Sequence, residues 1–389
     1  MIAALAARLR NLDLAEEAFA EACARAAAAW ADQPPRDPAA WLYAVGCRAA
    51  YDRLRRDAVR RRIAPDPPRP EATAEDHMAS DEALIPEERL RLIFICCHPA
   101  VASDARAALA LQVVCGLPAR TIAEAFLLPE ATLAQRLVRA KRKIAEAGVP
   151  FELPAPELWP ERIEAVLSTL EVAYARAYGD AGGAGEHAEF AGEVLRLSGL
   201  LAQLLPSDGE VLGLAALVRY AEARRPARLD DTGAMVPLDE QDPQLWRAEL
   251  MSEADALLGR AARLGAPGPR RLLAAVHAAH GERARGRPTP WRAILWLYDA
   301  LLQHRDDAVV RVNRLAAMAR VAGPEVALAE LKCLATPGVE RWGPYQALLA
   351  HLSAEIGDEE TARTAYAAAA AVAAPAERLW LERRAAALG

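Results

Sequence analysis

TIAEAFLLPEATLAQRLVRAKRK, residues 121–143, is the stretch that decides how the central part of this chain folds. It has the pattern of a short helix from 118 to about 127, a tight break at 128–129, and a longer second helix. The pattern therefore predicts a helix-turn-helix unit. The inward side chains of its short helix would be Ile122, Ala123 and Phe126.

The second helix of this unit has two chemically different faces. At about 100° per residue, apolar side chains gather on one narrow stripe and polar ones on the opposite side. The apolar stripe consists of Leu133, Leu137, Ala140 and Ile144. The polar side carries Thr132, Gln135, Arg136, Arg139, Arg142 and Lys143. One face can pack on the protein while the other enters a major groove.

Residues 131–143 contain five basic side chains and no acidic one. The five are Arg136, Arg139, Lys141, Arg142 and Lys143. Such a helix suits phosphate neutralisation and guanidinium contacts to guanine edges. The alternative is a solvated basic helix, because the chain has 44 arginines overall, but two of its three lysines lie here. Promoter-type DNA is therefore the leading candidate partner.

Length and charge restrict how the chain could bind nucleic acid. Its 389 residues allow two or three domains, and its net charge of -6 means that affinity for a phosphate backbone must be local. Residues 1–62 carry 11 basic and 8 acidic side chains, whereas residues 71–88 carry seven acids and no lysine or arginine. Positive modules thus flank an acidic connector.

Several classes of protein are disfavoured by what the sequence lacks. It contains no run of about eighteen apolar residues and no signal peptide, which predicts a cytoplasmic protein without membrane contact. Its six cysteines have no C-x-x-C spacing, so most are expected to be small core residues. Cys96-Cys97-His98 lacks a second ligand pair, and we expect no metal and no cofactor.

Alanine, leucine and arginine dominate the chain, and convincing strand patterns do not occur, so we predict an all-α fold. Residues 1–62 form a first module with helices to about Arg10, over 13–30 and over 38–62, and residues 63–82 form an acidic, proline-rich linker. Residues 83–148 form a second helical module, with Gly116 as a helix stop.

Residues 149–389 are predicted to form a separate, larger helical domain, which holds six of the eight tryptophans. Loops are expected at 179–185, 224–241 and 281–289. Segments 291–322, 325–334, 345–356 and 359–373 suggest antiparallel helix pairs. Gly357-Asp358 resembles the turn of a tetratricopeptide-like hairpin, with small and aromatic packing positions at Ala362, Ala365 and Tyr366.

A second basic helix, AWLYAVGCRAAYDRLRR (40–56), begins apolar and ends basic. Residues 1–148 resemble regions two and four of an extracytoplasmic-function (ECF) sigma factor in the order of their parts. These parts are an acidic-start helix, a proline break, this basic helix, a polar tether and a helix-turn-helix. IFICCHPAV (93–101) and PEATLAQRLVRAKRKI resemble the subgroup with a tetratricopeptide-like C-terminal extension. The resemblance extends over nearly the whole chain through three further stretches, LDEQDPQLW (238–246), WRAILWLYDAL (291–301) and ERLWLERR (377–384).

The resemblance implies a protein that is not an enzyme but binds core RNA polymerase and directs it to promoters. The acidic helix that meets polymerase would use Asp13, Glu16, Glu17 and Glu21. The helix at the downstream promoter element would use Arg48, Tyr51, Arg53, Arg55 and Arg56, beside a loop at 33–37. The upstream element would meet Arg120, Thr132, Gln135, Arg136, Arg139 and Lys143, with Gln135 and Arg136 on base edges.

The chain departs from the family pattern at three places. Its first helix is short, Ala20 replaces a usual glutamine, and residues 174–178 replace the usual Phe-Asn-Glu-Gly-Tyr opening of the extension. One rival interpretation is a helical scaffold that has lost polymerase binding. Another is an enzyme using His277 and His280, although two histidines three apart in an alanine-rich helix are more often packing or surface residues. The C-terminal domain is expected to control the sigma modules through intramolecular or polymerase contacts.

Overall fold

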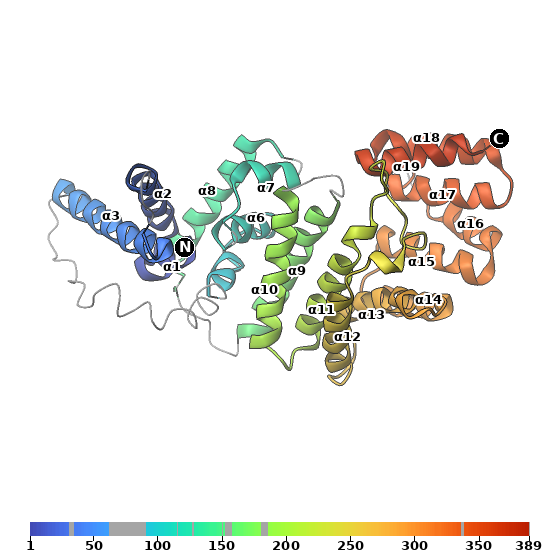
Figure 1. Ribbon diagram of the computed structural model, residues 1–389, viewed down its shortest axis with the longest axis horizontal. Helices are drawn as coiled ribbons and strands as arrows, with labels where there is room; N and C mark the ends of the chain where they lie inside the picture. Colours follow the sequence, from blue (N-terminus) through green and yellow to red (C-terminus); the bar gives the residue numbers. More distant parts are fainter. Residues whose placement is uncertain are drawn as a thin grey trace. The chain divides into compact units, whose positions relative to one another are not determined.

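The computed structural model (Figure 1) describes residues 1–30, 35–61, 91–114, 116–126, 128–149, 151, 158–179, 186–335 and 338–388. Every regular element in these residues is helical and none of them forms a strand, which confirms the predicted all-α class. The chain divides into two compact units, Met1–Arg176 and Ala177–Gly389. The predicted linker at 63–82 lies outside the described residues, and the predicted domain boundaries stay predictions.

The N-terminal unit begins with three mutually packed helices, α1 (Ile2–Leu9), α2 (Leu12–Ala29) and α3 (Pro38–Arg61). Their bounds confirm the three helices expected in residues 1–62. Asn11 caps α2 by accepting a hydrogen bond from the Leu14 amide at 3.0 Å. Gly46 lets α3 approach α1 closely, because a Cβ at this position would lie 3.1 Å from a Leu5 methyl carbon.

Four further helices complete the described part of the N-terminal unit, after a helical segment at 91–96. They are α6 (Ser103–Val113), α7 (Ala119–Ala125), α8 (Glu130–Glu146) and most of α9 (Trp159–Gly179). Gly116 has a φ of 70°, the left-handed conformation of a helix stop, and its amide donates to the Gln112 carbonyl at 3.1 Å. The unit therefore extends past 148, the predicted end of the second module, into α9.

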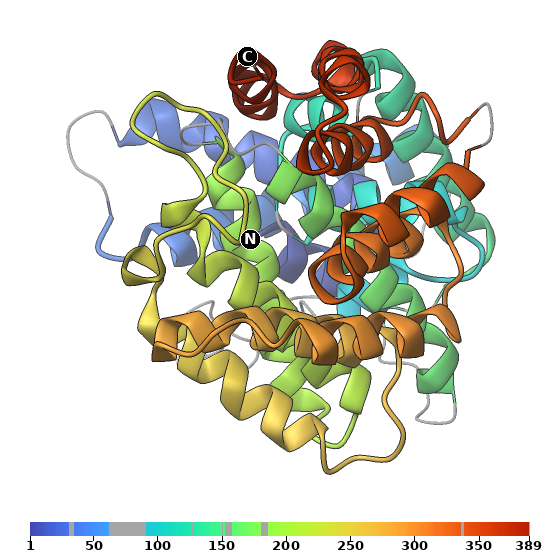
Figure 2. The ribbon, with the colours of Figure 1, turned by 90° about the vertical axis from the view of Figure 1, so that its right-hand side faces the viewer.

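The C-terminal unit is a succession of helices in which each packs on its sequence neighbours. Figure 1 labels them as α10 (Glu186–Leu204), α11 (Gly209–Ala223), α12 (Ala248–Ala261), α13 (Pro269–Gly281), α14 (Trp291–Leu302), α15 (Ala308–Ala322), α16 (Pro324–Cys333), α17 (Gly343–Glu355), α18 (Glu359–Val372) and α19 (Pro375–Ala386). Figure 2 shows α18 and α19, the two helices nearest the C-terminus, side by side. The α13, α16, α17 and α19 helices carry proline in their first turn, where its missing N–H costs nothing.

The predicted loops at 224–241 and 281–289 lie between helices, whereas residues 180–185 of the loop expected at 179–185 lie outside the described residues. The expected loop at 224–241 contains a short 3-10 helix, Arg225–Ala227, and a single β-bridge between Leu229 and Met235. Asp307 and Asp358 cap α15 and α18 by accepting hydrogen bonds from backbone amides. The predicted segments 291–322, 325–334, 345–356 and 359–373 are all helical, and the first of them is the α14 and α15 pair.

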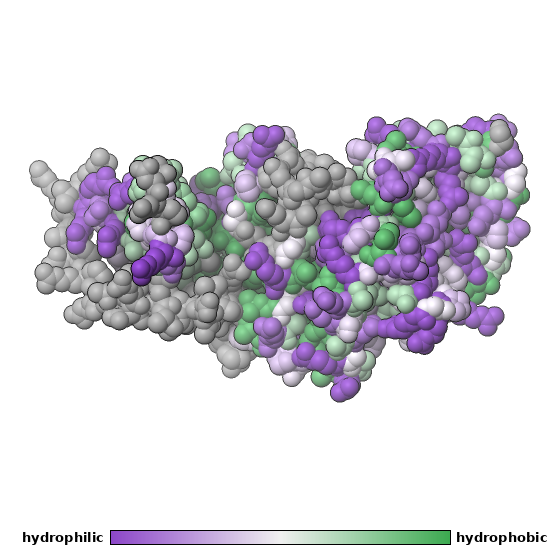
Figure 3. Space-filling view, in the orientation of Figure 1, coloured by the Kyte–Doolittle hydropathy of each residue, from purple (hydrophilic) through white to green (hydrophobic). Residues whose placement is uncertain are grey.

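Each unit has its own buried apolar core. In the C-terminal unit one cluster surrounds Tyr220 and Trp246, and others join α15 to α17 and α17 to α19. Polar residues cover much of its visible surface, with apolar patches between them (Figure 3). The expectation that most cysteines are core residues was wrong in part: Cys96 and Cys97 are buried, but Cys23 and Cys333 are exposed, because they lie on the outer faces of α2 and α16.

Candidate nucleic-acid interface

The first part of the candidate interface is the pair of helices α7 and α8. The Leu128 amide donates to the Ala123 carbonyl at 2.9 Å, which closes the turn after α7. Pro129 is the N-cap residue of α8, and its carbonyl accepts from the Thr132 amide at 2.9 Å. Ile122 and Ala123 are buried and Phe126 is half-buried, so the inward face of the short helix is as predicted.

The two faces predicted for α8 are present. Leu133, Leu137, Ala140 and Ile144 are all buried, which confirms the apolar stripe. Gln135, Arg139, Arg142 and Lys143 are exposed, while Thr132 and Arg136 are half-buried. No acidic side chain interrupts residues 131–143. The outer face of α8 therefore displays cationic and amide groups without an acid, beside the exposed Val138, and the buried stripe packs behind it.

Two acids next to this face already pair with its cations. The Arg136 guanidinium lies 3.1 Å from the Asp104 carboxylate of α6, so it is held against the neighbouring helix. Glu146 accepts a hydrogen bond from Lys143 at 3.0 Å, and this contact lowers the pKa of Glu146. Within the described residues, Arg139 makes only a local contact, from its Nε to the Gln135 carbonyl at 3.3 Å. Arg139 and Gln135 are therefore the side chains of this face most available to DNA.

Lys141 points away from this outer face. It is 8% exposed, and its Nζ lies 2.5 Å from Glu16 Oε2 and 3.8 Å from Asp13 Oδ1, both on α2. The candidate DNA-reading helix is thus joined by an ion pair to the helix expected to meet polymerase. Lys141 is one of the five basic side chains of residues 131–143 but was not among the residues predicted on the polar side. Its partner could not be predicted, because helical periodicity cannot show which distant helix covers a given side chain.

The second basic helix, α3, presents most of its predicted contact residues to solvent. Arg48, Arg53, Arg55 and Arg56 are exposed and Tyr51 is half-buried. Arg53 NH1 lies 2.5 Å from Glu17 Oε2 of α2, so one predicted DNA contact pairs with one predicted polymerase contact. The remaining arginines give the end of α3 a positive surface.

The loop predicted beside a flipped base lies only partly within the described residues, because 31–34 are outside them. Asp37 begins α3 by accepting a hydrogen bond from the Ala40 amide at 2.9 Å. The rings of Trp30 and Trp41 meet edge to face at 5.3 Å, one on each side of the loop. The start of α3 is thereby fixed to the end of α2.

The CCHPA segment, Cys96 to Ala100, has a packing role in the structure. Cys97 is buried and its Sγ lies 3.5 Å from the Thr169 hydroxyl of α9, and burial raises the Cys97 pKa to about 11. The Phe94 ring packs against Trp159 at 5.7 Å. Phe94 and Cys97 therefore pack on α9, and a buried thiol with so high a pKa is unreactive.

The two histidines considered as a catalytic pair lie inside the C-terminal unit. His277 contacts the guanidinium of Arg224, which is 2% exposed. Burial holds the pKa of His277 well below its ordinary value and lowers that of His280 to about 4. Both imidazoles are therefore neutral at pH 7.

In the described residues, no helix combines the length and apolar character needed to span a membrane.

Comparison with known proteins places the chain among relatives. Residues 162–262 match the model of a family of unknown function (DUF6596), a range that runs from α9 to the end of α12. An uncharacterized protein of Rhizobium meliloti (strain 1021) is 39% identical over 375 residues, which cover 95% of this chain and 88% of the relative. The chain belongs to that relative's family. No solved structure matches it.

Proposed function

We propose that the protein is an ECF-type sigma factor that binds core RNA polymerase and directs promoter-specific transcription initiation in the bacterial cytoplasm. The observation that carries this proposal is the outer face of α8, where Gln135, Arg139 and Lys143 are exposed without an acid between residues 131 and 143. A packed helix with such a face can enter a major groove, while side chains at its two ends contact backbone phosphates. α8 would read the upstream promoter element.

The three-helix module supports the same proposal. The exposed arginines at the end of α3 suit the phosphates around the downstream element, while α2 displays carboxylates toward a basic partner. Asp13, Glu17 and Glu21 have side-chain exposures of 70%, 48% and 51%. The proposed polymerase contacts lie on α2 and the proposed DNA contacts on α3, so the two partners would use different helices.

The Lys141 ion pair bears on how this function would be controlled. Glu16 is paired with Lys141 and Glu17 with Arg53, so part of the acidic surface proposed for polymerase is engaged within the unit. These pairs favour a scaffold as the second candidate function, since they need no outside partner. On our proposal polymerase competes with Lys141 for Glu16, and binding opens the contact.

Affinity for core RNA polymerase separates these two functions. We expect the full-length protein to bind purified bacterial core polymerase, and Glu21→Lys to weaken binding about tenfold through charge repulsion. Glu360→Lys is the matched control, because this acid lies in the first turn of α18 and has no proposed partner. Fluorescence titration measures both. A folded wild-type protein without measurable affinity would favour the scaffold.

The C-terminal unit would supply control, and its helix pairs would form a tetratricopeptide-like array. The motivation is its size and its covalent link directly after the DNA-reading module. A truncation that tests this role should end after Arg176 and not after Gly148, because α9 covers Phe94 and Cys97. If residues 1–176 transcribe as well as the full chain and respond to the same signal, the C-terminal unit has no control function.

A further inference from the structure

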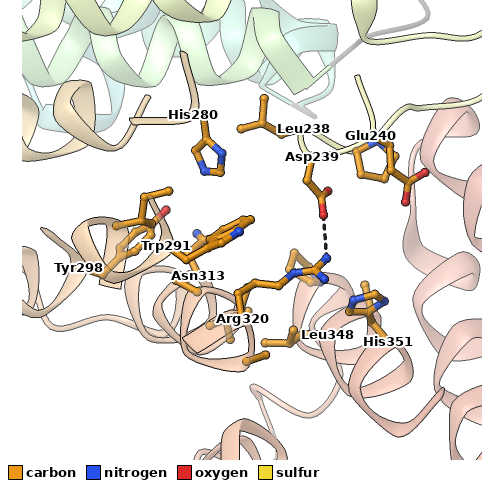
Figure 4. Close-up of a pocket in the computed structure, with 18 of the residues that line it drawn as sticks. Leu238, Asp239, Glu240, His280, Trp291, Tyr298, Asn313, Arg320, Leu348 and His351 are labelled. Atoms are coloured by element: carbon orange, nitrogen blue, oxygen red, sulfur yellow. Dashed lines mark hydrogen bonds and ion pairs between the residues drawn. The ribbon is translucent and has the colours of Figure 1, made fainter. Parts of the chain in front are cut away.

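A loop and five helices of the C-terminal unit, some of them distant in sequence, line one cavity of about 410 Å³. The loop before α12 contributes Leu238, Asp239 and Glu240. Helix α14 contributes Trp291, Ile294 and Tyr298, and α19 contributes Glu377 and Trp380. Figure 4 labels Leu238, Asp239, Glu240, Trp291 and Tyr298 among these, together with His280 of α13, Asn313 and Arg320 of α15, and Leu348 and His351 of α17. The volume is that of a small organic molecule.

Most of the charged groups around the cavity are already paired. Arg320 lies 2.7 Å from Asp239 and has its guanidinium 5.8 Å from the centre of the Trp291 ring. Glu240 pairs with Arg384, which itself lies over Trp380. These pairs fix the shape of the walls and leave Arg320 little capacity to attract an anion.

Glu377 is the exception among the charged groups. It is half-buried, and within the described part of the chain neither a cation nor a hydrogen-bond donor pairs with its carboxyl. Burial without a compensating partner raises its pKa. A half-buried carboxyl gains most from a ligand that brings a positive charge.

His280 is a second unpartnered group, independent of Glu377. Its side chain is on the cavity wall and the residue is only 9% exposed, yet Nδ1 has no hydrogen-bond partner within the described residues. The ring meets Trp291 edge to face at 5.3 Å. As a neutral imidazole it can accept a hydrogen bond, which suits a ligand that donates one.

We propose that this cavity binds a small organic cation, an ammonium or guanidinium group carried on an apolar or aromatic body, with Glu377 as its counter-ion. The aromatic side chains Trp291, Tyr298 and Trp380 would contact the body of the ligand, and His280 would accept from it. A bare metal ion would leave the apolar walls unused. This binding function does not depend on the proposed roles in DNA and polymerase binding.

Titration calorimetry of the full-length protein with 2-phenylethylamine and 3-phenylpropionate tests the proposal, because these probes share a ring and differ in charge. We expect saturable binding of the amine and at least about tenfold weaker binding of the acid, the factor that one charge-assisted contact supplies. No saturable binding of the amine, or equal binding of the two probes, would overturn it.

Two variants locate the site and one controls for charge. Glu377→Gln keeps the shape of the side chain and should weaken amine binding about tenfold. Ala316→Trp fills the cavity without changing its charge and should abolish binding. Glu382→Gln removes a carboxylate from α19 that does not line the cavity, and should leave affinity unchanged. Amine binding that survives both cavity variants in folded protein would contradict the proposal.

Discussion

Arginine, the abundant basic residue of this chain, occurs in contrasting environments in the two units. In the N-terminal unit Arg48, Arg55 and Arg139 are exposed on helix faces with little to hold them. In the C-terminal unit Arg224, Arg270 and Arg271 are 2%, 4% and 6% exposed. Arginine content alone therefore identifies no binding surface, because a guanidinium can be a ligand for phosphate or a part of the core.

Replacing one arginine from each unit should give the largest contrast. Arg271 donates to backbone carbonyls of 264–266 and packs against Gly209 and Gly213, so Arg271→Ala should lower the free energy of unfolding by about 3 kcal/mol. Arg139→Ala should change it by less than about 0.5 kcal/mol. Denaturant unfolding followed by circular dichroism measures both. Similar losses in the two variants would contradict the comparison.

Acid should destabilise the C-terminal unit through its buried histidines. The pKa of His280 falls from an ordinary 6.5 to about 4 in the folded chain, so the unfolded state binds more protons between these values. Stability is therefore fully present above pH 6.5 and falls as pH drops toward 4, by up to about 3 kcal/mol. His277 shifts in the same direction.

Hydrogen exchange of α13 at pH 7 and pH 5 follows this loss of stability. His280→Met should flatten part of the pH dependence, while His304→Met, which changes an exposed histidine, should not. A pH dependence that is unaltered in His280→Met would show that other groups cause the loss.

A smaller effect on stability is expected at the ion pair within the N-terminal unit. Lys141→Met should cost about 1 kcal/mol, because Glu16 keeps partial access to water while Lys141 is buried. The same change should strengthen binding to core polymerase by freeing Glu16, as titration can measure. Lys332→Met, on α16 of the C-terminal unit, is the control. Weaker polymerase binding by Lys141→Met would show that the pair does not compete with polymerase.

Local patterns in the sequence predicted helices and their faces well. The stripe of Leu133, Leu137 and Ile144 follows from helical periodicity, and the end of α6 follows from Gly116. The partners of side chains in distant parts of the chain could not be predicted from these patterns. Nothing near Lys141, for example, indicates that Glu16, 125 residues earlier, neutralises it. The cavity beside Trp291 was missed for the same reason, since its walls come from distant segments.

Run-off transcription tests the central proposal most directly. Bacterial core polymerase, this protein and a library of genomic promoter fragments would be combined with wild type, Arg139→Ala and Arg292→Ala, the last an exposed arginine of α14. A sigma factor that reads DNA with α8 should give promoter-specific transcripts that Arg139→Ala loses and Arg292→Ala keeps. Absence of specific transcripts with folded wild-type protein, or transcripts that survive unchanged in Arg139→Ala, would contradict it.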